Sequence, residues 1–253
     1  MLLCFAAFSL IVTIVNCVDC TGFKSNSQDS EEEVMNQVFF KNKNNGVYVE
    51  IGALDGLRFS NTLKLHHCYN WTGILIEGMK SNFERLQENV KTSRPDRVEI
   101  HYGAVCSPPT TTVSFVVGLV DATNGDAGEM SDSFKKRWTV PNSETIETPC
   151  FPMKYFLKNQ QHIDFFSLDV EGAELTAIET IDFSTTEIDV FMIELDNHNL
   201  HRNYKVRQVL FSLGYKECVQ VVARSAVFVS KKAYSTLYKC PNGANTVAHV
   251  NPA

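Results

Sequence analysis

The sequence predicts an α/β fold built around a mostly parallel β-sheet. Short apolar runs of strand type alternate with segments whose apolar residues recur at helical spacing. Strands separated by helices form βαβ units, which give parallel strands with right-handed crossovers. Near the end of the chain two strand-like runs follow each other with no helix between them, which predicts an antiparallel hairpin.

The first half of the chain supplies three predicted strands and three predicted helices. Ser30-x-x-Glu33 and Ser81-x-x-Glu84 are capping-box patterns, and they predict the starts of two helices because such side chains satisfy the first free N–H groups. A weaker helix is expected over 60–68. The predicted strands, which are short apolar runs, cover 47–52, 73–77 and 98–105.

The middle of the chain is less regular. Residues 110–117 are rich in β-branched side chains and are compatible with an extra hairpin strand. Residues 118–149 contain many Gly, Asp, Ser and Thr without clear periodicity, so we expect a long loop of the functional or mobile kind. Its mixed charges are expected to form a solvated face. They are Asp132, Lys135, Lys136 and Arg137.

The second half repeats the alternation of strand and helix. Strands are predicted over 163–168 and 188–193, with a helix over 171–181 between them. A stripe of Val and Leu residues then predicts a helix that stops at Gly214. The final hairpin is predicted from strands 215–222 and 226–229, joined by a turn at 223–225.

Composition indicates one ordinary globular domain. The chain has 253 residues, of which 44% are hydrophobic and 21% charged, and this excludes a disordered tail, a collagen-like repeat and a polytopic membrane protein. Lys and Arg number 23 against 29 Asp and Glu, which gives a formal net charge of -6. Nucleic acid is not expected as a partner, because no basic cluster is available to neutralise phosphates.

The N-terminus predicts entry into the secretory pathway. Residues 2–15 form an apolar run about as long as a signal-peptide core and shorter than the roughly 20 residues of a membrane-spanning helix. An uncleaved membrane anchor and a cytosolic apolar helix are the alternatives. The expected organisation has four parts. They are a signal peptide or anchor over 1–20, a linker and leading helix over 21–44, the main domain over 45–235, and a tail over 236–253.

Cysteines and a sequon fit the same compartment. Of the eight cysteines, Cys4 and Cys17 lie in the predicted signal peptide, and no two of the other six have Cys-x-x-Cys spacing. We therefore expect no metal site and up to three disulfides of open connectivity, with Cys106 and Cys218 alternatively as buried thiols. Asn70-Trp71-Thr72 is a glycosylation sequon that becomes relevant in the lumen. A secreted glycoprotein, or one of the endoplasmic reticulum or Golgi, is expected.

Acidic residues end four of the predicted parallel strands. They are Glu50, Glu77, Asp169 and Glu194. Ligands of such sheets bind outside the carboxyl ends of the strands. The turn Glu50-Ile51-Gly52-Ala53-Leu54-Asp55-Gly56 holds two glycines, which let the backbone approach a ligand closely. Glu77 follows Gly56 by 21 residues, the interval at which an acid commonly accepts ribose hydroxyls.

The acids around this turn discriminate between adenosine ligands. Glu50 and Asp55 would repel a diphosphate. S-adenosylmethionine (SAM) carries an ammonium, a sulfonium and only one carboxylate, so the charges favour SAM as the cofactor. The alternative is that Glu50 merely ends a strand and that Gly52 and Gly56 merely turn the chain.

Five longer segments carry a family resemblance. They are VYVEIGALDGLRFSNTL, WTGILIEGMKSNFERLQEN, GAVC at 103–106, IDFFSLDVEGAELTAIETIDF and IDVFMIELD. Over roughly residues 45–230 the chain resembles the FkbM-type SAM-dependent methyltransferases, particularly their animal branch, and LDVEGAE at 168–174 is the most specific part. The resemblance implies a Rossmann-like class I methyltransferase fold, with a mostly parallel seven-stranded sheet and a C-terminal antiparallel hairpin.

The resemblance also implies roles for single residues. The implied cofactor-binding residues are Glu50, Gly52, Ala53, Asp55, Gly56, Glu77, Ala104 and Asp169. Glu77 matches the acid that binds ribose, and Ala104 falls where the family passes the adenine. Leu54 departs from many bacterial members, which have Asn at this position, and therefore gives up a possible polar contact to the methionine end of SAM.

Methyl transfer is an in-line displacement that needs positioning and, for a hydroxyl acceptor, a base. Asp169 and Glu171 are the expected catalytic residues, with Glu194, His198 and His201 as alternatives. In the alternative interpretation, the negative charge of Asp169 or Glu171 only stabilises the N-terminus of the following helix, and the two histidines lie in a solvated loop.

Two functions follow. The first is SAM-dependent O-methylation of a sugar or another small hydroxylated acceptor in the secretory pathway, with membrane contact only through an N-terminal anchor. The second is a catalytically inactive, Star-like protein that acts in trafficking of cargo from the endoplasmic reticulum to the Golgi and endosomes. A lumenal location makes the second function a serious alternative, because SAM is made in the cytosol and would have to be imported.

Overall fold

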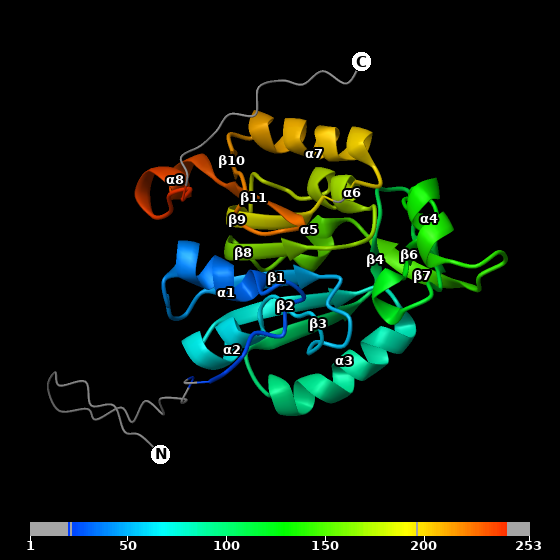
Figure 1. Cartoon of the computed structure of the whole chain (residues 1–253), viewed down its shortest axis with the longest axis horizontal. Helices are drawn as coiled ribbons and strands as arrows, with labels where there is room; N and C mark the ends of the chain where they lie inside the picture. The colour runs from blue at the N-terminus through cyan, green and yellow to red at the C-terminus, as the bar shows by residue number, and fades with distance from the viewer. Residues whose placement is uncertain (1–19, 21, 196, 242–253) are drawn as a thin grey trace, which may run out of the picture.

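A computed structural model of the protein describes residues 20, 22–195 and 197–241. Most of the predicted signal peptide or anchor therefore lies outside the described residues, as do residues 242–253 of the predicted tail. Figure 1 shows a central sheet covered by helices, with a smaller sheet beyond one end of its strands.

The central sheet has seven strands in the order β10-β11-β9-β8-β1-β2-β3. The strands from β9 to β3 in this order are parallel, whereas β11 pairs antiparallel with both β9 and β10. The predicted fold class is confirmed. The strands are β1 Val47–Ile51, β2 Thr72–Glu77, β3 Val98–Tyr102, β8 His162–Leu168, β9 Glu187–Glu194, β10 Lys216–Cys218 and β11 Ser225–Val229. The hairpin turn predicted at 223–225 is wrong, because β10 already ends at Cys218.

Helices cover both faces of this sheet. Helices α5, α6 and α7 pack on one face through a shared core that includes Phe156, Ile178 and Leu210. Phe40 and Leu86 belong to the core on the other face, formed with α1, the π-helical turn η1, α2, α3 and α8. Burial on both sides explains why the central parallel strands consist mainly of apolar residues. The bounds are α1 Glu31–Met35, η1 Asn36–Phe40, α2 Leu63–Tyr69, α3 Lys80–Ser93, α5 Met153–Phe156, α6 Glu174–Glu179, α7 Leu200–Ser212 and α8 Lys231–Thr236.

Neither predicted capping box forms. Ser30 precedes α1 with a φ of 63° and makes no side-chain cap, and Ser81 lies inside α3. Glu32 is instead fully buried and accepts hydrogen bonds from the N–H groups of Lys64 and Leu65, at 2.6 and 3.0 Å. The leading helix therefore caps the start of α2 through a contact between distant segments.

The segment expected to be a long loop is instead part of a second sheet. Its four strands pair in the order β4-β7-β5-β6. They are β4 Ala104–Val105, β5 Thr112–Val116, β6 Gly125–Asp126 and β7 Thr145–Phe151, with η2 Asp121–Thr123 and α4 Asp132–Trp138 between them. β7 was not recognisable, because it is only half-buried and its sequence mixes polar residues and Pro149 among few apolar ones. β5 supplies the extra hairpin strand.

Three disulfides connect the fold. They join Cys20 to Cys68, Cys106 to Cys150, and Cys218 to Cys240. The expected upper limit of three is therefore reached, and Cys106 and Cys218 are not free thiols. Three disulfides are consistent with an oxidising secretory or extracellular environment. Within the described part of the chain, no helix has both the length and the apolar character needed to cross a bilayer.

Candidate active site

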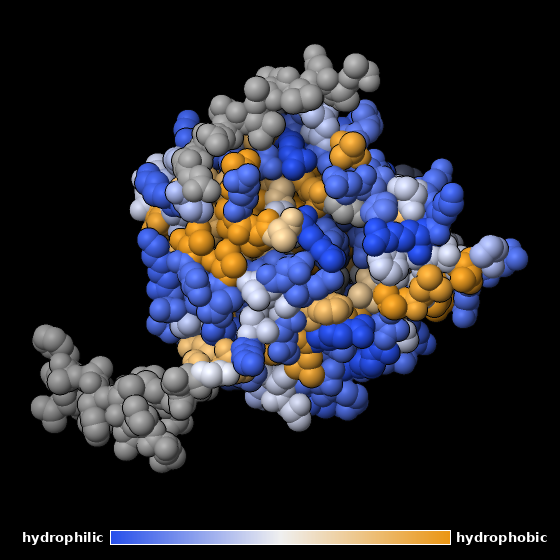
Figure 2. All heavy atoms as spheres, in the orientation of Figure 1, coloured by the Kyte–Doolittle hydropathy of each residue, from blue (hydrophilic) through white to orange (hydrophobic). Residues whose placement is uncertain are grey.

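A cleft of about 760 Å³ opens at the carboxyl ends of β1, β2, β8 and β9. Its opposite wall comes from β5, η2 and α4, the projection that Figure 1 shows beyond the strand ends. Figure 2 shows hydrophobic residues along this projection, where Leu119, Val120 and Val140 are exposed, beside a mostly hydrophilic surface. The cleft therefore lies where parallel α/β sheets bind their ligands.

The turn after β1 fixes Glu77 at the edge of the cleft. Gly52 has a φ of 80°, and a Cβ on it would lie 1.8 Å from the carbonyl oxygen of Asp169, so only glycine fits there. The N–H of Leu54, which has a φ of 53°, donates to Glu77 Oε2 at 2.8 Å. The N–H of Met79 donates to Oε1 at 2.7 Å. Glu77 is 6% exposed and lines the cleft at the tip of β2.

Glu50 also lines the cleft, but its carboxylate holds the loop after β1 as well. The hydroxyls of Ser60 and Thr62 donate to Oε2 at 2.9 and 2.5 Å, and the N–H of Asn61 donates to Oε1 at 2.7 Å. The fully buried guanidinium of Arg94 lies 3.8 Å from Oε2 and donates to both hydroxyl oxygens. Glu50 therefore has a structural role whether or not it contacts a ligand.

Three carboxylates gather where β8 and β9 end. Asp169, Glu171 and Glu194 line the cleft, and each places an oxygen within 4.8 Å of the other two. The side chain of Asp169 is open to solvent within the cleft, although protein atoms surround it closely. This enclosure, followed by the negative charges of Glu194 and Glu171, raises the pKa of Asp169 well above its usual range. The raised pKa makes Asp169 a stronger base than an ordinary aspartate, and the three acids together could also hold a divalent cation.

Glu174 shapes the turn that carries Asp169 and Glu171. Its Oε1 accepts hydrogen bonds from the N–H groups of Val170 and Gly172, at 3.3 and 3.0 Å. Burial raises the pKa of Glu174 to about 7. The helix predicted over 171–181 therefore begins only at Glu174, because the preceding residues form this turn.

Aromatic and polar side chains face the acids from the opposite wall. Phe134 and Trp138 of α4 line the cleft, as does His198, whose Nδ1 lies 3.1 Å from Ser133 Oγ. Arg137 also lines the cleft, and its guanidinium carbon lies 4.9 Å from the ring centre of Trp138. Part of the charged stretch expected to be only a solvated face therefore borders the site.

The structure brings most of the sequence-predicted site residues into this cleft. The predicted residues that line it are Glu50, Gly52, Glu77, Ala104, Asp169 and Glu171. Ala53 lies in the core, and Asp55 uses Oδ1 to accept hydrogen bonds from the next turn of the loop. Gly56 packs against Leu86 instead of lining the cleft. Of the catalytic alternatives, Glu194 and His198 line the cleft, whereas His201 does not.

A comparison with protein families matches this part of the chain. The family model described as the methyltransferase FkbM domain covers residues 50–217, which include the acids at the tips of β1, β2, β8 and β9. The chain belongs to the FkbM methyltransferase family. This membership confirms the resemblance found in the sequence and supports SAM as the cofactor.

Several solved methyltransferase structures are similar to this FkbM protein at low identity. An FkbM methyltransferase from Methylobacillus flagellatus is 14% identical with a TM-score of 0.43, and the match covers 74% of this chain and 44% of that one. The chain thus spans less than half the length of that relative. A putative O-methyltransferase from Klebsiella pneumoniae is 10% identical over 81% of this chain and 80% of that one, with a TM-score of 0.42.

Fibrillarin from Aeropyrum pernix, solved with natively bound SAM, is 9% identical over 79% of this chain and 72% of that one, with a TM-score of 0.43. A comparison with curated protein sequences finds no match.

Three residues that shape the site were not predicted from the sequence. Arg94 follows the end of α3 and carries no sequence signal for its contact with the loop after β1. Glu174 belongs to the motif LDVEGAE, but its backbone contacts need the turn at Gly172 to be known. Asn61 lines the cleft with a buried Oδ1 that has no hydrogen-bond partner among the described residues.

Proposed function

We propose that this FkbM protein is a SAM-dependent methyltransferase that methylates an oxygen atom of a sugar or another small hydroxylated acceptor in the secretory pathway. One observation carries the proposal. A single cleft joins the fixed carboxylate of Glu77 to the acids around Asp169, at the strand ends where this fold binds ligands.

The cleft fits SAM in charge and in hydrogen-bonding capacity. Glu50, Asp169 and Glu171 supply the negative charge that suits an ammonium and a sulfonium. The unpartnered Oδ1 of Asn61 is an acceptor for a ligand N–H or O–H, because a buried polar atom costs free energy when it stays unpaired. SAM, when bound, supplies the electrophilic methyl group. Ala104 would border its adenine.

Glu77 is suited to binding ribose hydroxyls. Burial raises its pKa to about 7, even though two backbone N–H groups stabilise the charged form. A buried carboxylate that is this costly to ionise is stabilised by further hydrogen bonds, and the two neighbouring hydroxyls of a ribose can donate them. Glu77 therefore fixes the nucleoside through its ribose.

Asp169 is suited to act as the general base. Its pKa is raised well above that of an ordinary aspartate, which makes its carboxylate a stronger base. Glu171 and Glu194 keep the pKa high through their charge. Asp169 would take the proton of an acceptor hydroxyl as the oxygen attacks.

The opposite wall favours a sugar-like acceptor. Trp138 offers aromatic surface for the apolar face of a sugar ring, Arg137 of the same helix offers hydrogen bonds, and His198 from the loop after β9 offers another polar contact. A cleft of about 760 Å³ is large for a ligand pocket and leaves room for an acceptor next to the cofactor.

The secretory context rests on the disulfides and on the sequon. Asn70 is exposed at the end of α2, whereas the next residue, Trp71, is fully buried. The asparagine is thus the accessible part of the sequon, and we expect it to carry a glycan. Loss of that glycan in Asn70→Gln, seen as a faster-migrating band, tests lumenal entry.

Binding of SAM is the first test. The purified, disulfide-intact chain should melt about 5–10 °C higher at SAM concentrations near 100 times Kd. Glu77→Gln should remove most of this shift. Glu99→Gln, a change of an exposed glutamate on β3, is the matched control and should keep it. If millimolar SAM does not raise the melting temperature of the wild-type protein, the cofactor assignment is refuted and the trafficking function is favoured.

Turnover is the second test. With labelled SAM, the wild-type protein should transfer methyl groups to members of a panel of glycans and small hydroxyl compounds. Asp169→Asn should still bind SAM but lose transfer by about 100-fold or more, which is the usual contribution of a general base. Transfer at the wild-type rate by Asp169→Asn would exclude that role.

A further inference from the structure

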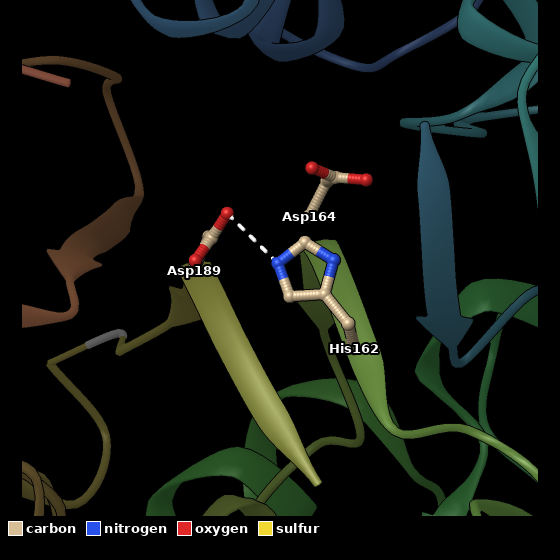
Figure 3. Close-up of side chains that lie close together, drawn as sticks. All are labelled: His162, Asp164 and Asp189. Atoms are coloured by element: carbon tan, nitrogen blue, oxygen red, sulfur yellow. Dashed lines mark hydrogen bonds and ion pairs between the residues drawn. The ribbon is translucent and has the colours of Figure 1, made fainter. Parts of the chain in front are cut away.

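A second cluster of ligating side chains lies at the opposite ends of the strands from the cleft. Figure 3 shows His162 and Asp164 of β8 together with Asp189 of β9. His162 Nε2 lies 3.1 Å from Asp189 Oδ2, and one atom from each side chain lies within 4.8 Å of the other two. No metal site was predicted from the sequence, because the cysteines beyond the predicted signal peptide lack Cys-x-x-Cys spacing.

The two carboxylates of this cluster are buried. Asp164 and Asp189 are 3% and 2% exposed, and charges at such depth are unfavourable unless they are paired. Asp164 forms an ion pair with Lys43 and accepts a hydrogen bond from the N–H of Val47 at 2.8 Å. Asp189 has His162 as its ion-pair partner, and that imidazole is 45% exposed. The only permanently charged cation paired with these two carboxylates among the described residues is thus the half-exposed Lys43.

Tyr238 gives an independent indication of a missing ligand. It is 5% exposed, and its hydroxyl has no hydrogen-bond partner among the described residues. Burial, followed by the charges of Asp164 and Asp189, raises the pKa of this phenol. A buried hydroxyl that stays unpaired is unfavourable, and a ligand at the cluster would relieve that cost by using its oxygen.

We propose that His162, Asp164 and Asp189 bind one zinc ion, with the hydroxyl of Tyr238 directed at the same site. One imidazole nitrogen and two carboxylate oxygens suit zinc, whereas calcium and magnesium prefer oxygen ligands alone. Zinc bonds of 2.0–2.1 Å place tetrahedral ligands roughly 3.3 Å apart, close to the 3.1 Å between His162 Nε2 and Asp189 Oδ2.

The zinc ion would stabilise the fold and would take no part in methyl transfer. β8 is seven residues long, so His162 lies about 20 Å from the cleft end of that strand. The ion would join β8 and β9 to Tyr238, which follows α8. Lys43 would leave Asp164 when zinc binds, because both cations need the same carboxylate. The inference therefore does not depend on the proposed function.

Zinc binding by the full chain without a histidine tag tests this site. The protein is stripped with a chelator and titrated with zinc sulfate alone by calorimetry, while the melting temperature is followed separately. We expect one zinc ion per chain and a higher melting temperature. His162→Gln should weaken binding by about 100-fold, and Tyr238→Phe by about tenfold, as expected for an outer partner.

Two further variants keep the test decisive. Lys43→Met should bind zinc several-fold more tightly, because it removes the competing cation. His101→Gln is the matched control, since His101 lies 2.9 Å from only one carboxylate, Glu99 on β3, and this variant should bind as wild type does. His162→Gln changes a half-exposed side chain and keeps a hydrogen-bond donor for Asp189, and its melting temperature without zinc checks that the variant is folded. Absence of stoichiometric zinc binding, or unchanged binding by His162→Gln, would overturn the proposal.

Discussion

Arg94 offers the most direct test of how the fold builds the cleft. The variant Arg94→Met removes a fully buried guanidinium that donates to Tyr48, Ser60 and Thr62 and lies 3.8 Å from Glu50. The Glu50 carboxylate, which is 3% exposed, would lose its cation while staying buried. Breaking such a pair on one side costs about 3–5 kcal/mol, a large part of the 5–15 kcal/mol that stabilises a typical domain.

The assay is urea unfolding at neutral pH with the disulfides intact, followed by the fluorescence of the fully buried Trp71. A loss of about 3–5 kcal/mol should also lower the melting temperature by about 10 °C. Arg97→Met is the control, because Arg97 is 34% exposed and, within the described part of the chain, forms its ion pair with the exposed Asp96. This control should cost less than about 1 kcal/mol.

A double-mutant cycle then separates the charge pair from general packing. Glu50→Gln removes the carboxylate charge, so adding it to Arg94→Met should cost less than the sum of the two single changes, with a coupling of about 1–3 kcal/mol. The reasoning is refuted if Arg94→Met costs no more than Arg97→Met. It is equally refuted if the two changes at Arg94 and Glu50 are additive.

Three further predictions concern buried acids and a disulfide. Burial raises the pKa of Glu77 to about 7, so SAM affinity should fall as the pH drops below about 7, because the proton then blocks hydrogen bonds from ribose. The variant Glu77→Gln should bind SAM more weakly, and its affinity should change less with pH. Glu32 also has a pKa raised to about 7 by burial, so the folded protein binds its proton more tightly than the unfolded chain, and stability should fall as pH rises from about 4.5 to 7. Glu32→Gln should therefore be more stable than wild type at pH 8 by about 1–3 kcal/mol in urea unfolding, with no such gain at pH 4.5. Replacing Cys106 and Cys150 together by serine opens a closed loop of 44 residues and should cost about 4 kcal/mol, visible as a lower urea midpoint, whereas an unchanged midpoint would show that this disulfide does not form.

The sequence was sufficient to predict the central sheet because its strands carry their own signal. β1, β8 and β9 are mainly apolar runs with an acid at or next to the carboxyl end, and the parallel arrangement brings those ends together whatever the loops do. This is why Glu50, Glu77 and Asp169 could be assigned to one cleft before the structure was described.

The wall opposite the acids could not be predicted in the same way. β7 becomes a strand through pairing with β5 and β4, which are distant in sequence, and its own residues have no alternation strong enough to show it. The capping boxes failed for a related reason. Glu32 satisfies the N–H groups of Lys64 and Leu65 in a different helix, so a local pattern at Ser30 could not reveal the cap that forms.

The backbone of the turn after β1 lies directly against the backbone at the end of β8, which joins the two halves of the site. A Cβ on Gly52 would lie 1.8 Å from the carbonyl oxygen of Asp169, and the N–H of Asp169 donates to the carbonyl of Ile51 at 3.2 Å. The turn after β1 and the end of β8 therefore cannot move apart or together independently. Through Leu54 the same turn holds Glu77, so the acids expected at the ribose and at the acceptor are set by one rigid unit. A fixed spacing of this kind is what an in-line transfer requires, because the reacting groups must already be aligned when the cofactor binds.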